Sequence, residues 1–157
     1  MALSLDASVR ARIAEAFQPL LATMLDLNLT LKQAHWNIRG SGFRSLHLHL
    51  DEIFETTQEF SDEIAERMVA LDYPADGRAA SVCKWTHLEA MPSGFVPVPA
   101  AARYVIAALD STISALRQAQ AAVADLDMPS EDLIIGMVRD LEKQRWMMHA
   151  EIDERAE

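Results

Sequence analysis

Five residues between positions 35 and 66 constrain this chain more than any other feature of its sequence. They are two histidines and three acids at successive spacings of 12, 4, 11 and 4, namely His35, His47, Asp51, Asp62 and Glu66. Imidazole and carboxylate ligands suit ferrous iron, zinc or manganese, whereas a soft thiolate site needs several cysteines, and the chain has one. The set therefore predicts a metal site with nitrogen and oxygen ligands.

The last four of these residues fall on one expected helix. No proline or glycine interrupts the segment from Leu46 to about Leu71, which favours a continuous helix. At about 100° per residue, the four side chains lie within an arc of about 100°, so they share one face. This face is called the ligand stripe below, and it consists of His47, Asp51, Asp62 and Glu66.

The ligand stripe is too long to close on one ion within one chain. Asp51 and Asp62 are eleven residues apart, which is about 16 Å along a helix, whereas the ligands of one ion must lie about 2 Å from it. The stripe therefore contains an N-terminal half-site (His47 and Asp51) and a C-terminal half-site (Asp62 and Glu66). A second copy packed antiparallel about a two-fold axis near Thr56 and Thr57 would join opposite halves. The spacing thus predicts two identical centres between subunits, with His35 added from the preceding helix.

The sequence around these residues resembles the signature of the Dps family, the mini-ferritins also described as DNA-binding proteins from starved cells. The resemblance rests on KQAHWNIRG at 32–40, LH at 46–47 with the acid at 51, DEIAER at 62–67 and LEKQRWM at 141–147. It covers almost the whole chain, and all five positions of the family's ferroxidase pattern hold the expected residue types. It implies a ferroxidase that oxidises Fe(II), preferably with hydrogen peroxide, stores ferric mineral in a hollow homo-dodecamer and protects DNA from oxidative damage.

The resemblance also implies how the five ligands are divided. It assigns His35, His47 and Asp51 to one subunit's share of each iron centre, and Asp62 and Glu66 to the partner's share. Carboxylates stabilise Fe(III) as its charge rises, and neutral imidazole holds Fe(II) beforehand. Zinc or manganese at the same ligands, without redox function, is an alternative occupant.

Four further side chains are candidates for supporting roles. Trp36 and Trp146 match tryptophans that lie beside the iron site in the family. They either accept oxidising equivalents or fill a subunit interface, and we favour packing. Lys32 and Arg67 are candidates for ion pairs around the ligands, although a solvated charge is the commoner state of such residues.

Net charge separates the two activities of the family. The chain carries a net charge of −10 at pH 7, which concentrates Fe(II) and opposes binding to phosphates. Many family members have a lysine-rich tail, whereas this chain has no lysine before Lys32, ends in Arg155-Ala156-Glu157, and clusters basic residues near its start only at Arg10 and Arg12. We expect weak or absent DNA binding, so a nucleoid-packing protein with an incidental metal site is the second hypothesis.

Acids near the start of the last expected helix have two interpretations. The three-fold pores of the family are lined by acids at this place, and the matching residues are Asp127, Glu131 and Asp132. Acids at a helix N-terminus are also ordinary partners of the helix dipole. A pore and a dipole contact are equally compatible with the sequence.

Helical periodicity runs along the rest of the chain. An apolar face recurs through residues 8–37, where Pro19 is expected to kink or break the helix. Two more helices are expected, from Pro99 to about Asp125 and from Pro129 toward the C-terminus. No strand pattern and no internal repeat accompany them.

A long connection at 72–98 separates the second long helix from the third. Its glycines and prolines interrupt regular structure, and a short helix is expected at 79–84 or 85–90. Such a connection can return the chain along a bundle about 40 Å long. We predict an all-α, ferritin-like four-helix bundle with one long crossover, in a single domain of residues 1–157.

Composition narrows the cellular context. A chain of 157 residues that is 50% hydrophobic can bury a sizeable core. We find no secretory leader and no apolar run long enough to span a membrane. The single Cys83 is interpreted as a structural thiol in a reducing compartment, and the remaining histidines as surface or core residues: His49, His87 and His149. These features predict a bacterial cytoplasmic protein, with association to the nucleoid left open.

Overall fold

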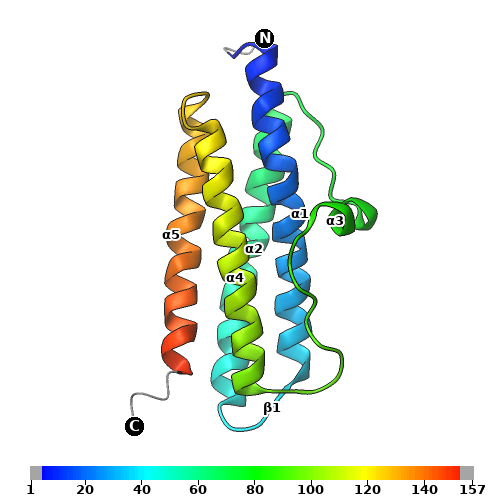
Figure 1. Cartoon of the computed structure of the whole chain (residues 1–157), viewed down its shortest axis with the longest axis vertical. Helices are drawn as coiled ribbons and strands as arrows, with labels where there is room; N and C mark the ends of the chain where they lie inside the picture. Colours follow the sequence, from blue (N-terminus) through cyan, green and yellow to red (C-terminus); the bar gives the residue numbers. More distant parts are fainter. Residues whose placement is uncertain (1–4, 153–157) are drawn as a thin grey trace.

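The computed structural model describes residues 5–152, so the C-terminal residues on which part of the DNA expectation rests lie outside the described chain. Four long helices lie side by side in a bundle (Figure 1). They are α1 (Ala7–Asn37), α2 (Phe43–Ala70), α4 (Val98–Val123) and α5 (Met128–Glu151), and a short helix, α3 (Ala79–Trp85), lies in the crossover beside α1. The predicted all-α bundle with one long crossover is confirmed.

The crossover contains the short helix at the first of its two expected places. Helix α3 begins at Ala79, and the chain then runs without regular structure to β2 (Val96–Pro97). This strand pairs in parallel with β1 (Ile38–Arg39), in the register Ile38 to Val96. The sequence shows no strand pattern for this pair, because a two-residue ladder is too short to produce an alternating pattern. The pairing ties the start of α4 to the end of α1.

Helix α1 runs unbroken across Pro19, contrary to the alternative that it divides in two. Proline lacks the N–H that would bond to the carbonyl four residues earlier. That carbonyl belongs to Glu15, an exposed residue, where water can supply the missing donor. Packing against the other helices keeps α1 continuous here, since Phe17 and Leu20 on either side of the proline are almost fully buried.

Apolar side chains from all four long helices fill the centre of the bundle. Leu27, Leu31, Ile53, Ile64 and Leu109 have no exposed surface. Burying a side chain of this size contributes about 1.5–3 kcal/mol, so the core supplies the main force that aligns the helices. No helix among residues 5–152 is long and apolar enough to cross a membrane.

Candidate metal centre

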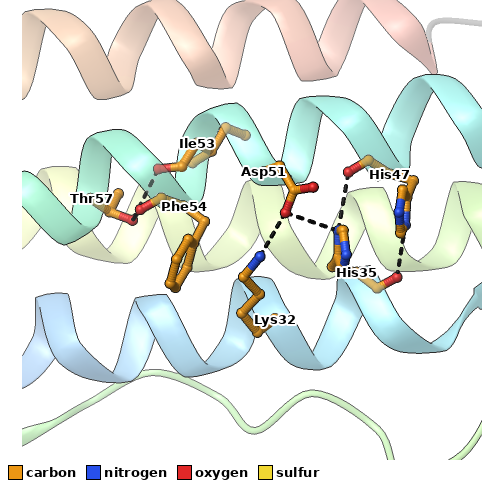
Figure 2. Close-up of polar contacts among 7 residues, drawn as sticks. All are labelled: Lys32, His35, His47, Asp51, Ile53, Phe54 and Thr57. Atoms are coloured by element: carbon orange, nitrogen blue, oxygen red, sulfur yellow. Dashed lines mark hydrogen bonds and ion pairs between the residues drawn. The ribbon is translucent and has the colours of Figure 1, made fainter.

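One histidine of α1 and two residues of the ligand stripe meet near one end of the bundle (Figure 2). His35 lies in the last turn of α1, and His47 and Asp51 lie one turn apart on α2. Their ligand atoms all lie within 4.8 Å of one another, and the two imidazole rings stack with their centroids 3.7 Å apart. Two nitrogens and a carboxylate oxygen at this separation form half of a coordination shell for a divalent ion.

Reciprocal contacts with the backbone set the tautomers of the two imidazoles. His35 Nδ1 lies 3.2 Å from the carbonyl oxygen of His47, and His47 Nδ1 lies 3.2 Å from the carbonyl oxygen of His35. A carbonyl oxygen only accepts, so each Nδ1 donates a hydrogen. In a neutral imidazole the other nitrogen, Nε2, then carries the lone pair that binds a metal. His35 Nδ1 also lies 3.2 Å from Asp51 Oδ1 (Figure 2). In this tautomer each ring keeps the Nε2 lone pair for a metal.

Lys32 reaches the carboxylate of this cluster. Its ammonium donates to Asp51 Oδ1 at 2.6 Å and lies 4.3 Å from the ring centroid of Phe54 (Figure 2). The hydrogen bond from Lys32 lowers the pKa of Asp51, burial opposes this effect, and the electrostatic influence of the neighbouring His35 adds to the lowering. Asp51 is thus an anion at neutral pH, and a cation that binds Oδ1 competes with Lys32.

The C-terminal half-site does not join this cluster. Asp62 and Glu66 are exposed on α2, and Asp62 lines an open hollow of about 810 Å³ together with Glu55, Gln58 and Glu59. Within residues 5–152, the only group of three or more side chains close enough to hold an ion is His35, His47 and Asp51. A second chain is needed to bring acids of the stripe onto such a group.

The middle of α2 shows which side chains a second copy would meet. Thr57, expected near the two-fold axis, is fully buried and donates a hydrogen bond to Asn28 inside the bundle. The face that continues the ligand stripe at this level carries Glu55 and Gln58 instead, and both are exposed. A two-fold axis at this level would therefore pass beside Glu55 and Gln58 and not beside Thr57.

The two tryptophans lie on different helices. Trp36 is 69% exposed and lines a mostly apolar cavity of about 580 Å³ with Leu29 and Phe54. Trp146 is 65% exposed on α5, which carries none of the five ligands. Neither ring is packed within its own chain, so the packing interpretation of both requires a contact with another subunit.

Asp127 caps α5 rather than lying free on the surface. Its carboxylate accepts from the backbone N–H of Ser130 at 3.0 Å and also forms an ion pair with Arg67. Burial raises the pKa of Asp127, but the hydrogen bonds from Ser130 and Arg67 outweigh burial and lower it. Glu131 is half-buried and Asp132 is exposed. Of the three acids considered for a pore, Asp127 is thus paired with a cation, whereas Glu131 and Asp132 form no salt bridge within the described residues.

The other side chains considered from the sequence lie away from the centre. Arg67 pairs with Asp127 and donates to Ser130 Oγ at 2.9 Å, so it supports the α2–α5 contact and not the metal cluster. His49 is buried, and its ring nitrogens face Gln144 and Glu151 of α5. His87, His149 and Cys83 are exposed.

Sequence reasoning missed two aromatic residues that shape the centre. Phe43 stacks on His47 with ring centroids 4.9 Å apart, and Phe54 lies beneath the Lys32 ammonium. The available signal was their spacing, because Phe43 precedes His47 by one helical turn and Phe54 follows Asp51 by nearly one. Aromatic residues at such spacings are common in cores, so the pattern alone does not assign them to a site.

Comparison with known proteins places these features in a wider context. The family model described as Ferritin-like domain matches residues 14–156. The chain is 30% identical over 141 residues to the DNA protection during starvation protein of Mycolicibacterium smegmatis, and the aligned region covers 90% of this chain and 77% of that protein. It is 33% identical over 141 residues to the fine tangled pili major subunit of Haemophilus ducreyi, with 90% and 75% covered. The solved structure of Dps from Microbacterium arborescens in the high iron form is similar with a TM-score of 0.92 and 33% identity, over 98% of this chain and 100% of that one.

Proposed function

Since the chain belongs to the Dps family of ferritin-like proteins, we propose that it oxidises Fe(II) at centres shared between two subunits and stores the ferric product in a hollow homo-dodecamer. Membership of the family implies iron storage, ferroxidase activity and protection of DNA. Hydrogen peroxide is the preferred oxidant in this proposal. The observation that supports it most directly is the half-shell of His35, His47 and Asp51, whose ligand atoms lie within 4.8 Å of one another.

Each centre is completed by a neighbouring subunit. One chain supplies His35, His47 and Asp51, and the partner subunit's Asp62 and Glu66 complete the shell. Neutral imidazole binds Fe(II) without adding charge, and the three carboxylates gain attraction for iron as its charge rises. One hydrogen peroxide accepts two electrons, one from each of two Fe(II) ions, and with two protons yields two waters. Iron is thereby removed as Fe(III) without one-electron reduction of the peroxide.

In this proposal the protein protects DNA without binding it tightly. It consumes Fe(II) and hydrogen peroxide together, and these are the reactants whose products damage DNA. The net charge of −10 opposes contact with phosphates, so the nucleoid-packing hypothesis remains second. A redox-inactive zinc or manganese centre would use the same ligands, and no feature of the described chain favours it. We treat residues 1–157 as one domain of a bacterial cytoplasmic protein.

The proposal is tested by anaerobic oxidation of Fe(II). Purified protein is loaded with Fe(II), and the appearance of Fe(III) absorbance is followed after addition of hydrogen peroxide or of dioxygen. We expect rapid oxidation with peroxide, slower oxidation with dioxygen, and a ferric product that stays in solution with the protein after centrifugation. A rate equal to that of buffer with both oxidants would contradict the ferroxidase function.

Replacing Lys32 with methionine is expected to tighten Fe(II) binding by about tenfold, which corresponds to about 1.4 kcal/mol. The ammonium occupies Asp51 Oδ1 at 2.6 Å, and methionine keeps the aliphatic stem over Phe54 without that competition. Anaerobic calorimetric titration with Fe(II) measures the change. Lys143→Met removes the same charge from an exposed position on α5 and should leave the affinity unchanged. Equal affinities in the Lys32 variant and the natural chain would show that Lys32 does not compete with the ion.

A further inference from the structure

A buried hydrogen-bond network joins α1 to α2 midway between the two half-sites. Asn28 of α1 donates from Nδ2 to Ser61 Oγ at 2.9 Å and accepts at Oδ1 from Thr57 Oγ1 at 2.6 Å. The exposed fractions of Asn28, Thr57 and Ser61 are 8%, 0% and 6%. Ser61 in turn donates to the carbonyl oxygen of Thr57 at 2.9 Å. A single amide therefore bridges two hydroxyl groups that lie one turn apart on α2.

This network fits only one register of α2 against α1. Ile53 lies one turn before Thr57, and Ala65 lies one turn after Ser61. A slide of α2 by one turn, about 5.4 Å, would place an aliphatic side chain opposite one end of the Asn28 amide. That end would then be buried without a hydrogen-bond partner, which is unfavourable.

The surrounding contacts do not select the register as sharply. Around the network the α1–α2 contact is formed largely by aliphatic side chains, which attract one another without directional preference. The other polar contacts between these helices, from Lys32 to Asp51 and between His35 and His47, are only partly buried, so water can replace them at a smaller cost. A polar group inside an apolar helix interface is the best-attested device for specifying how two helices align. The Asn28 network is placed to act in this way.

The metal half-shell depends on the same register. His35 follows Asn28 by seven residues on α1, which is two turns along nearly the same face. The paired contacts between His35 and His47 are 3.2 Å long, so a shift of α2 by a fraction of a turn would break them. Ser61 immediately precedes Asp62, so the network also sets the axial position of the C-terminal half-site relative to α1.

We propose that Asn28 is a positioning residue that aligns α2 on α1, so that His35 of α1 is held against His47 and Asp51 of α2. It touches no ligand of the iron centre and acts through Thr57 and Ser61. The catalytic consequence rests on the proposed ferroxidase function, whereas the geometry of the half-shell can be probed with a different metal.

Two substitutions break the network from opposite helices. Asn28→Leu keeps a similar volume and leaves the α2 hydroxyls satisfied, because Thr57 Oγ1 also lies 3.0 Å from the carbonyl oxygen of Ile53. Thr57→Val removes the hydroxyl and keeps the shape, and Thr57→Ser restores the hydroxyl. Thr112→Val is the matched control, because Thr112 is 1% exposed and bonds to the Ala108 carbonyl within its own helix α4.

The readouts are Co(II) binding, peroxide-driven Fe(II) oxidation and circular dichroism of the full chain. The visible absorption band of Co(II) reports the number and geometry of its ligands. We expect Asn28→Leu and Thr57→Val to stay helical, to bind Co(II) about tenfold more weakly with an altered band, and to lose about tenfold or more in oxidation rate. Thr57→Ser and Thr112→Val should match the natural chain.

An unchanged Co(II) affinity and band in folded Asn28→Leu would overturn the proposal, and so would an equal loss in Thr112→Val, which would indicate general destabilisation. If Asn28→Leu does not fold, the comparison of Thr57→Val with Thr57→Ser decides the question. If the natural chain binds Co(II) but does not oxidise Fe(II), the proposed function fails, and the Co(II) comparison still tests the positioning role.

Discussion

Replacing Asp62 with asparagine is expected to lower the rate of peroxide-driven Fe(II) oxidation by about a hundredfold. The amide keeps the size of the side chain but removes the negative charge that stabilises Fe(III), and the loss of about 3 kcal/mol of such stabilisation gives this factor. Asp62 is exposed in its own chain, so the helical content and the assembly should not change. The rate of Fe(III) formation under anaerobic conditions measures the effect.

A neighbouring acid provides the control for charge. Glu63 is also exposed on α2 but lies outside the ligand stripe, so Glu63→Gln removes the same charge and should retain the natural rate. Equal losses in Asp62→Asn and Glu63→Gln would show that only overall charge matters. Full activity in Asp62→Asn would remove the C-terminal half-site from the centre.

Mixed assemblies distinguish a shared centre from one within a chain. Asp62→Asn and His35→Ala subunits are unfolded, combined in equal amounts and refolded together. In a mixed two-fold dimer, one centre combines the intact imidazoles of the Asp62→Asn subunit with the intact acids of the His35→Ala subunit. The other centre lacks both the His35 imidazole and the Asp62 carboxylate. Random pairing should therefore restore about a quarter of the natural rate. A mixture as inactive as its two components would contradict the intersubunit centre.

Replacing Leu29 with glutamate is expected to separate the subunits and abolish oxidation while all five ligands remain. Leu29 is 65% exposed in the single chain and lines the apolar cavity beside Trp36 and Phe54, a surface that we expect the partner subunit to cover. An unpaired charge buried there would cost about 3 kcal/mol or more, which weakens association by roughly a hundredfold or more. Analytical ultracentrifugation and the Fe(II) assay measure the two effects.

The matched control places the same charge on another helix. Gln118 is exposed on α4, which carries none of the ligands, so Gln118→Glu should leave assembly and rate unchanged. A Leu29→Glu chain that stays assembled would show that this surface is not buried between subunits. A dissociated chain that retains the full rate would show that one subunit contains a complete centre.

Local sequence rules identified the long helices well, and two features of the fold lay beyond them. Pro19 is unfavourable in an isolated helix, but packing of its neighbours on both sides holds α1 continuous. The pairing of Ile38 with Val96 joins segments far apart in the chain, and two residues are too few for any periodic signal. Both outcomes depend on contacts that a local window of sequence does not contain.

Charged side chains near the candidate centre were harder to assign than the ligands. From the sequence, Lys32 and Arg67 are equally plausible ion-pair partners of the ligands. In the structure Lys32 bonds to the ligand Asp51, whereas Arg67 pairs with Asp127 at the start of α5. A long flexible side chain can reach several acids, and only the packing of the helices selects one. The cap formed by Asp127 likewise depends on the approach of α2 to the start of α5.

By itself, the sequence determined the bundle and the single face of α2 that carries four potential ligands, and it predicted a centre shared with a second chain, because helical periodicity and rise follow from the backbone alone. The tertiary structure alone decided that His35 meets His47 and Asp51, that Lys32 occupies an oxygen of Asp51, and that Asn28 is bonded to Thr57 and Ser61. These contacts cross between helices, and their distances depend on how α1 and α2 pack and in which register. Periodicity places a residue on a face, and packing places it against a partner.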